Sequence, residues 1–145
     1  MATPQNLINV LVHFVWGTWD RLPLITPNIE RRLHRHIEAV SLEMKCDVLA
    51  LNGTEDHVHL LVALHNTVTL ADLMARVKGA SSHFVNEELN PDIPFKWQGS
   101  YGAFSVSPSH KRQVMDYINR QKEHHALGTF RPNAEKMATY YDRDS

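Results

Sequence analysis

The sequence predicts an α+β fold: an antiparallel four-stranded sheet of the ferredoxin-like, split β-α-β type, with an additional C-terminal helix. Strand-like and helix-like segments follow one another in the order β-α-β-β-α-β-α, and all but the last match the split β-α-β pattern. The chain has 145 residues and 43% hydrophobic residues, which suits one packed core. We therefore expect a single domain over residues 1–145, with helices on one sheet face and residues 129–145 as a polar tail.

The first half of the chain carries a strand, a helix and a second strand. Residues 7–16 are β-branched and aromatic without alternation, which is typical of a buried strand. Thr26 can cap a helix with Pro27 at its first position, and apolar residues then recur at helical spacing up to an expected end near Lys45. Residues 47–53 form the second predicted strand.

A hairpin and a second helix follow. Residues 57–64 are predicted to be the third strand, joined to the second by a tight turn at residues 54–56. Thr69 and Asp72 form a capping box at the start of a helix over residues 70–88.

Two histidines lie in the third predicted strand, in the run Glu-Asp-His-Val-His-Leu-Leu-Val. His57 and His59 are two residues apart, so their side chains should project from the same sheet face. Two neutral imidazoles can hold a divalent metal and leave coordination positions open for a substrate. The alternative is polar surface, or one hydrogen-bonded and one exposed histidine. Glu55 is either a partner that orients His57 or a turn residue.

The last predicted helix carries a tyrosine and a glutamine on its apolar face. After a strand at residues 102–107, it begins at Ser107 and Pro108 and ends at Gly128. Tyr117 and Gln121 are one turn apart. A buried amide needs a partner, which a metal or polar site would supply. The alternative is a core tyrosine beside a solvated glutamine.

Together these residues would supply a metal site and a nucleophile. A divalent ion polarises a phosphodiester and neutralises charge on its oxygens. The tyrosine hydroxyl can attack phosphorus, and because its pKa is about 10, phenolate is also a competent leaving group. A DNA 3′-hydroxyl could therefore reverse the link. This chemistry predicts a strand transferase rather than a simple nuclease.

Composition limits the partners. The formal net charge is -1, so no global positive field favours nucleic acid, and DNA binding must rest on local groups. The candidates are Lys78 with its neighbours Ser81 and Ser82, and the last-helix residues Arg120 and Lys122. A single cysteine fits a reducing compartment, and no apolar run has membrane-spanning length. We expect a cytoplasmic protein without a membrane partner.

An ordered set of motifs resembles the single-tyrosine transposases of the HUH endonuclease superfamily, the small insertion-sequence and REP-associated kind. The motifs cover roughly residues 7–127: His13-Phe14-Val15-Trp16, Asp56-His57-Val58-His59-Leu60-Leu61-Val62, Lys78-Gly79-Ala80-Ser81-Ser82, Trp97-Gln98-Gly99-Ser100-Tyr101-Gly102-Ala103-Phe104-Ser105-Val106-Ser107, and Tyr117-Ile118-Asn119-Arg120-Gln121 followed by His124 and His125.

The resemblance implies a mechanism and partners. His57 and His59 would bind Mg²⁺ or Mn²⁺, and Gln121 could complete the site. Tyr117 would be the nucleophile that forms a 5′-phosphotyrosine link on single-stranded DNA, at hairpins near the ends of a mobile element. Members work as homodimers, in which the tyrosine helix of one subunit can serve the other subunit's histidines. Members are usually more basic than this chain.

Three other functions fit parts of the pattern. A rolling-circle-type nickase or relaxase would use the same chemistry. A non-catalytic single-stranded nucleic-acid-binding module would use only the sheet and keep the histidines as relics. A metal-dependent hydrolase of small phosphodiesters would act without a covalent intermediate.

Overall fold

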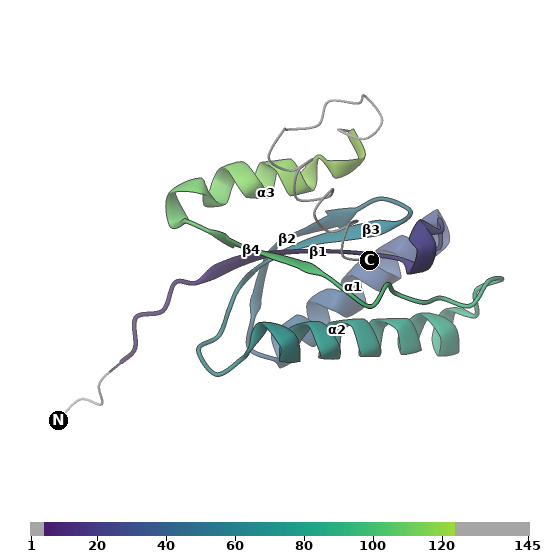
Figure 1. The fold of residues 1–145 in the computed structure, drawn as a ribbon, viewed down its shortest axis with the longest axis horizontal. Coiled ribbons are helices and arrows are strands. Elements are labelled where there is room, and N and C mark those ends of the chain that lie inside the picture. Colours follow the sequence, from purple (N-terminus) through teal and green to yellow (C-terminus); the bar gives the residue numbers. More distant parts are fainter. Residues whose placement is uncertain (1–4, 124–145) are drawn as a thin grey trace.

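The sheet has four antiparallel strands in the order β2-β3-β1-β4, as the computed structural model shows for residues 5–123, the part of the chain that it describes (Figure 1). This order, with helices after the first and third strands, confirms the predicted ferredoxin-like α+β fold. The strands are β1 Leu11–Gly17, β2 Asp47–Gly53, β3 His57–Ala63 and β4 Gly102–Val106.

Two helices cover one face of the sheet and a third lies on the other (Figure 1). The first two are α1 Pro27–Glu43 and α2 Leu70–Phe84, and the third is α3 Lys111–Asn119. The Thr69 hydroxyl accepts a hydrogen bond from the Asp72 amide at 3.0 Å, which confirms the predicted start of α2. Thr26 caps α1 only through its backbone position, with Pro27 following it.

Five predicted elements have ends that differ in the structure. β1 begins at Leu11 rather than at residue 7, because pairing with β3 and with β4 begins there, and Leu7 is 97% exposed. α1 ends at Glu43, before Lys45, which takes a positive φ of 63°. The α-helical part of α2 ends at Phe84, and the chain continues as a short π-helical turn, Val85–Leu89. β3 and β4 each end one residue before the prediction, at Ala63 and Val106.

The sheet separates two apolar clusters, which explains why every residue of β1 is buried. The main core lies between the sheet and α1 and α2, and includes Phe14, Trp16, Leu33, Ile37, Leu60, Leu73 and Val77. A smaller cluster lies under α3 and comprises Leu11, Ala50, Leu61, Tyr117 and Ile118. Because side chains alternate along β3, the face that carries Leu61 also carries the two histidines. The histidines therefore face α3.

The last helix is interrupted. A 3₁₀ turn, Pro108–His110, leads into α3; a turn at Arg120 follows, and residues 121–123 are helical again. The predicted end at Gly128 and the tail at 129–145 lie outside the described residues. Within residues 5–123, the helices are too short or too polar to cross a membrane.

Candidate active site

His57 and His59 lie side by side on the face of β3 that α3 covers. Their ring centroids are 5.1 Å apart, with the edge of one ring toward the face of the other. Their exposed fractions are 4% and 2%, so the interpretation as polar surface does not hold. Two buried imidazoles on a rigid strand need polar partners, and the structure provides a separate set for each ring.

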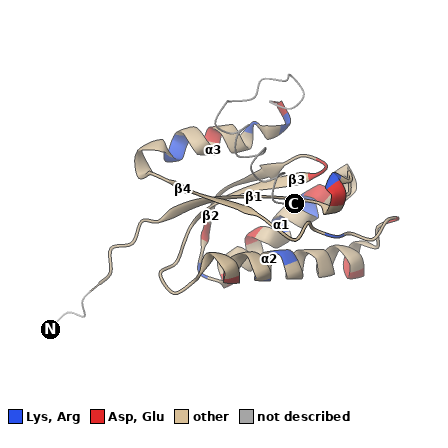
Figure 2. Cartoon of the chain, viewed as in Figure 1, with Lys and Arg blue, Asp and Glu red and all other residues tan. Residues whose placement is uncertain are grey.

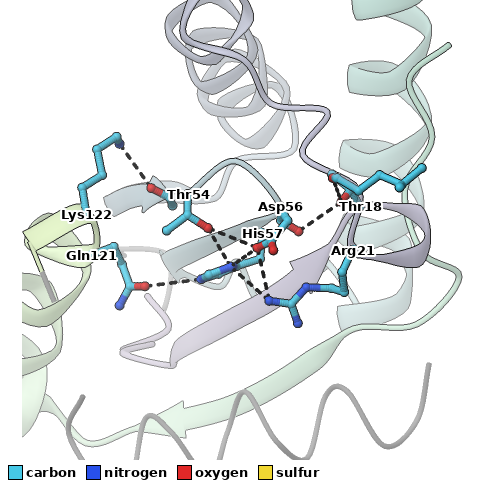
Figure 3. Close-up of polar contacts among 9 residues, drawn as sticks. Thr18, Arg21, Thr54, Asp56, His57, Gln121 and Lys122 are labelled. Atoms are coloured by element: carbon cyan, nitrogen blue, oxygen red, sulfur yellow. Dashed lines mark hydrogen bonds and ion pairs between the residues drawn. The ribbon is translucent and has the colours of Figure 1, made fainter. Parts of the chain in front are cut away.

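The Nδ1 atom of His57 lies 2.8 Å from Oδ1 of Asp56 and 2.9 Å from the Thr54 hydroxyl (Figure 3). A carboxylate can only accept a hydrogen bond, so Nδ1 carries the proton and donates it to Asp56. The neutral ring then has its lone pair on Nε2. This is the arrangement by which carboxylates orient histidines that bind metals.

Asp56 stays ionised. Burial alone would raise the pKa of its carboxyl group, but the hydrogen bond from His57 and the positive charge of Arg21 outweigh burial and lower the pKa to about 2. Nη2 of Arg21 lies 3.2 Å from Oδ1 of Asp56. Arg21 and its neighbour Asp20 both have φ of 54°, an uncommon conformation for residues other than glycine. Glu55 is exposed in the turn, so the partner of His57 is Asp56.

Tyr117 and Gln121 reach the two histidines from the opposite side of the site. The Tyr117 ring lies edge-on to His59, with centroids 6.0 Å apart. The Gln121 side chain is fully buried, and its Oε1 lies 3.4 Å from Nε2 of His57 (Figure 3). The interpretation of Gln121 as a solvated residue therefore does not hold. All four predicted site residues meet within one chain.

Lys122 ties the end of the last helix to the sheet and to α1. Its Nζ donates to Oδ1 of Asn52 at 2.7 Å and to the carbonyl of Gly53 at 3.2 Å, and it forms an ion pair with Glu30 at 2.8 Å. The Asn52 amide in turn donates to the carbonyl of Asn119 at 3.1 Å. We call these contacts the Lys122 clamp. Since Gln121 directly precedes Lys122, these contacts also hold Gln121 at its distance from His57.

The types of donor atom suit a divalent cation, and one pair of them has about the spacing of neighbouring ligands. Within the described residues, no three His, Cys, Asp or Glu side chains are grouped for metal binding, so the candidate ligands are two imidazoles and one amide oxygen. Two ligand atoms at about 2.1 Å from one ion and at right angles would be about 3.0 Å apart. Nε2 of His57 and Oε1 of Gln121, at 3.4 Å, are close to that spacing. Nitrogen and neutral oxygen donors together suit a divalent metal of intermediate hardness.

The predicted DNA-binding residues fall into two groups on opposite faces of the sheet. On α2, Lys78 donates to the carbonyls of Gln98 and Ser100, and burial lowers its pKa. The buried Ser81 hydroxyl accepts from Nε1 of Trp97 at 2.9 Å, and Ser82 donates to a carbonyl of its own helix. Lys78 and Ser81 thus hold residues 97–100 against α2.

The second group is Arg120 and Lys122, beyond α3. Arg120 is exposed and pairs with Glu123 at 3.4 Å, whereas Lys122 forms the clamp. In the coloured part of the chain, Figure 2 shows Lys and Arg interspersed with Asp and Glu on all three helices.

One functional candidate was missed by sequence reasoning. His13 on β1 is 2% exposed, and its Nε2 lies 2.9 Å from Nδ1 of His59. Burial lowers the pKa of His13 to about 4, so the ring is neutral near pH 7. The run His13-Phe14-Val15-Trp16 drew attention to this residue in the sequence. Which of the two histidines of β3 it would contact, however, depends on the pairing of β1 with β3. The contacts of Asp56 were also missed, although this residue directly precedes His57.

Comparison with known proteins identifies the family. Residues 6–121 match the profile of IS200-like transposases. The chain is 24% identical over 119 residues to the ISDra2 transposase TnpA of Deinococcus radiodurans, covering 77% of this chain and 83% of that protein.

Two solved structures share the fold. One, described as a transposase from D. radiodurans R1, has a TM-score of 0.62 at 22% identity and covers 83% of this chain and 98% of its own. The other, a REP-associated tyrosine transposase bound to a REP hairpin, has a TM-score of 0.62 at 15% identity and covers 86% and 74%. With the profile match over most of its length, the chain belongs to the IS200-like transposase family.

Proposed function

We propose that this transposase cleaves and rejoins single-stranded DNA at hairpin-marked element ends, through a 5′-phosphotyrosine link on Tyr117. His57, His59 and Gln121 would hold Mg²⁺ or Mn²⁺. The observation that carries the proposal is the meeting of the last helix with the histidine pair: Gln121 lies 3.4 Å from His57, and the Tyr117 ring is 6.0 Å from that of His59. The hairpin bound by a structural neighbour supports hairpin DNA as the substrate class.

The tyrosine carries the covalent chemistry. Its hydroxyl oxygen attacks phosphorus, a tyrosyl O–P bond forms, and the bond from phosphorus to the 3′ oxygen breaks. The phenol loses its proton, and the departing 3′ oxygen takes up a proton. The reverse attack by a 3′-hydroxyl releases phenolate, which leaves readily because its conjugate acid has a pKa of about 10. Each exchange conserves the number of phosphate ester bonds, so no external energy source is needed.

The three proposed metal ligands would favour binding of a DNA phosphate at the site. A divalent cation held there would polarise the phosphodiester and offset charge on its oxygens. His57, His59 and Gln121 are all neutral donors, so they leave the charge of the cation uncancelled. The carboxylate of Asp56 contacts Nδ1 of His57 and also pairs with Arg21. It would orient His57 rather than bind the substrate.

We propose that side chains of two groups contact the phosphates of the DNA. One group is Arg120 and Lys122, close to Tyr117, and the other is Lys78 with Ser81 and Ser82 on α2. Lys78 directs two of its three N–H bonds to carbonyls, which leaves a third for a phosphate. Because the two groups lie on opposite faces of the sheet, one DNA strand would lie near α3 and another part of the DNA near α2.

The decisive test uses labelled single-stranded hairpin oligonucleotides that carry candidate element ends, incubated with the protein and Mn²⁺. We expect a protein–DNA adduct that survives denaturation in SDS. Tyr117→Phe should abolish it. The control variant Tyr101→Phe, whose ring packs against Phe14 on the other sheet face, should retain it. Absence of an adduct for every candidate end, or an adduct formed by Tyr117→Phe, would contradict the proposal.

The same experiment separates the alternatives. A non-catalytic binding module would bind the oligonucleotides without a divalent ion, and His57→Ala would not change its affinity. A small-phosphodiester hydrolase would turn over substrate without an adduct. A rolling-circle-type nickase would form the adduct but would not join two element ends.

We also propose a homodimer. In it, Tyr117 could serve the histidine pair of its own subunit or that of the partner subunit. In the described chain, Tyr117 lies beside the histidines of its own sheet. Mixed dimers of His57→Ala and Tyr117→Phe subunits distinguish the two arrangements. If the tyrosine acts within its own subunit, both sites are defective and the mixture stays inactive. If it acts on the partner, one site is intact and cleavage returns.

A further inference from the structure

We propose that His13 is a positioning residue for the metal: it accepts a hydrogen bond from Nδ1–H of His59 and thereby makes Nε2 of His59 the metal-binding nitrogen. The inference rests on the proposed function, because it assigns a role toward the divalent ion of that site.

The placement of His13 follows from strand pairing. β1 and β3 are adjacent antiparallel strands in which Val15 lies opposite His59 and His13 lies opposite Leu61. His13 is therefore the diagonal neighbour of His59 on the same face, within reach of a ring side chain. The atoms Nε2 of His13 and Nδ1 of His59 are 2.9 Å apart, a normal hydrogen-bond distance.

One proton lies between these two nitrogens, and its position decides which nitrogen of His59 can bind a metal. If His13 donates, Nδ1 of His59 holds the lone pair but is already turned toward β1, and Nε2 carries a proton. If His59 donates, Nε2 has the lone pair. Only the second arrangement makes His59 a ligand through Nε2. The ligands of known metal sites behave in this way, each donating its second ring N–H to a fixed acceptor.

His57 supports the assignment. Its Nδ1 donates to Asp56 at 2.8 Å, so its lone pair is also on Nε2. The two histidines then have matching tautomers, each set by an acceptor at Nδ1. The acceptors differ in charge: a carboxylate serves His57 and a neutral imidazole serves His59. A neutral acceptor orients His59 without adding a second negative charge where a DNA phosphate must approach.

A purely packing role does not account for the residue type. His13 is 2% exposed and lies on the sheet face that also carries Leu11. A buried imidazole in such surroundings is costly unless it is hydrogen-bonded, so an apolar side chain would fill the space more favourably. The bond to His59 is what an apolar residue would not supply.

Two substitutions separate the acceptor role from packing. In His13→Gln the side-chain oxygen can still accept from His59, whereas in His13→Phe the volume is filled and no acceptor remains. His36→Phe is the matched control, because this histidine stacks on Phe84 between α1 and α2, with ring centroids 4.3 Å apart. Thermal unfolding shows which variants are folded.

The first readout is nitrogen NMR of the imidazoles in the full, metal-free chain near neutral pH. We expect the wild-type proton of His59 on Nδ1, retention of that tautomer in His13→Gln, and its loss in His13→Phe. The second readout is Mn²⁺ affinity by electron paramagnetic resonance. His13→Phe should bind Mn²⁺ about 10–100-fold more weakly than wild type, and the other two variants should bind within a few-fold of it.

The outcomes separate this inference from the proposed function. If wild type does not bind Mn²⁺, the proposed metal function fails. If wild type binds Mn²⁺ and folded His13→Phe binds it equally well, only the role of His13 is overturned. A wild-type His59 with its proton on Nε2 would also overturn it. Because the tautomer is measured in wild type, the inference stays testable even if His13→Phe does not fold.

Discussion

Asp56 and His57 are neighbours in sequence, yet their side chains meet, with Oδ1 of Asp56 at 2.8 Å from Nδ1 of His57. Neighbours within a strand point to opposite faces, and the contact forms because Asp56 lies in the turn just before β3 begins. The β-hairpin formed by β2 and β3 thus carries both a proposed metal ligand, His57, and the group that orients it, Asp56.

Removing the charge of this partner should weaken metal binding. We expect Asp56→Asn to keep the shape of the side chain but to lower Mn²⁺ affinity about 10–100-fold, because an amide orients the imidazole less strongly. Titration calorimetry with Mn²⁺ measures the change. Asp92→Asn, at an exposed loop position, is the control. Equal affinities of Asp56→Asn and wild type would show that Asp56 does not act through His57.

The Lys122 clamp should control the position of Gln121. In Lys122→Met the contacts to Asn52, Gly53 and Glu30 are lost, so we expect faster amide hydrogen exchange across residues 117–121 and less adduct formation. Global stability should fall by only about 0–1 kcal/mol, because the Lys122 side chain is about half exposed. Lys111→Met, at the exposed start of α3, should change neither readout. Unaltered exchange in Lys122→Met would contradict the role of the clamp.

The hairpin before the first histidine should require glycine at position 53. A Cβ atom on Gly53 would lie 2.2 Å from the carbonyl oxygen of His57 and 3.0 Å from Cα of Val58, both backbone atoms that cannot move independently. We expect Gly53→Ala to lower the free energy of unfolding by roughly 1–3 kcal/mol, measured by urea denaturation.

Gly79→Ala provides the comparison. Apart from its chain neighbours and the backbone of its own helix, a Cβ at this position would meet nothing within 4 Å, so we expect a neutral effect or stabilisation of up to about 1 kcal/mol. Equal effects of the two alanine substitutions would contradict the close approach of β2 and β3 at Gly53.

Stability should fall as the pH drops from about 6.5 to about 4, partly through His34 on α1. Burial lowers the pKa of His34 from 6.5 to about 4; Glu30 raises this pKa and Lys122 lowers it further. Below pH 6.5 the unfolded chain therefore takes up a proton that the folded chain does not, and the folded state loses free energy relative to it. Above pH 6.5 both states are neutral at this site, and the full stability is present.

We expect His34→Gln to make this pH dependence shallower, with the contribution of His13 remaining. Urea midpoints at several pH values across this range measure the slope. His83→Gln, at an exposed position of α2, should keep the wild-type slope. Equal slopes for His34→Gln and wild type would contradict the assignment.

Local patterns predicted the elements well and their ends less well. The bounds of β2 match the prediction, as does the cap at Thr69, because both depend on residues close in sequence. The predicted start of β1 was four residues early, since residues 7–10 have strand-forming side chains but lie before the first paired residue, Leu11. A strand's end is set by its partners rather than by its own composition.

The sequence by itself determined that His57 and His59 share a face, through the two-residue period of a strand, because that period is local and fixed by backbone geometry. It also predicted that Tyr117 and Gln121 lie one helical turn apart, but the helix is interrupted at Arg120 between them. Only the tertiary structure decided what those faces meet. The contacts of His13 with His59, of Lys122 with Asn52, and of Gln121 with His57 join residues 46, 70 and 64 positions apart. They depend on strand register and on the docking of α3, which are set by the packing of the whole sheet rather than by any one segment.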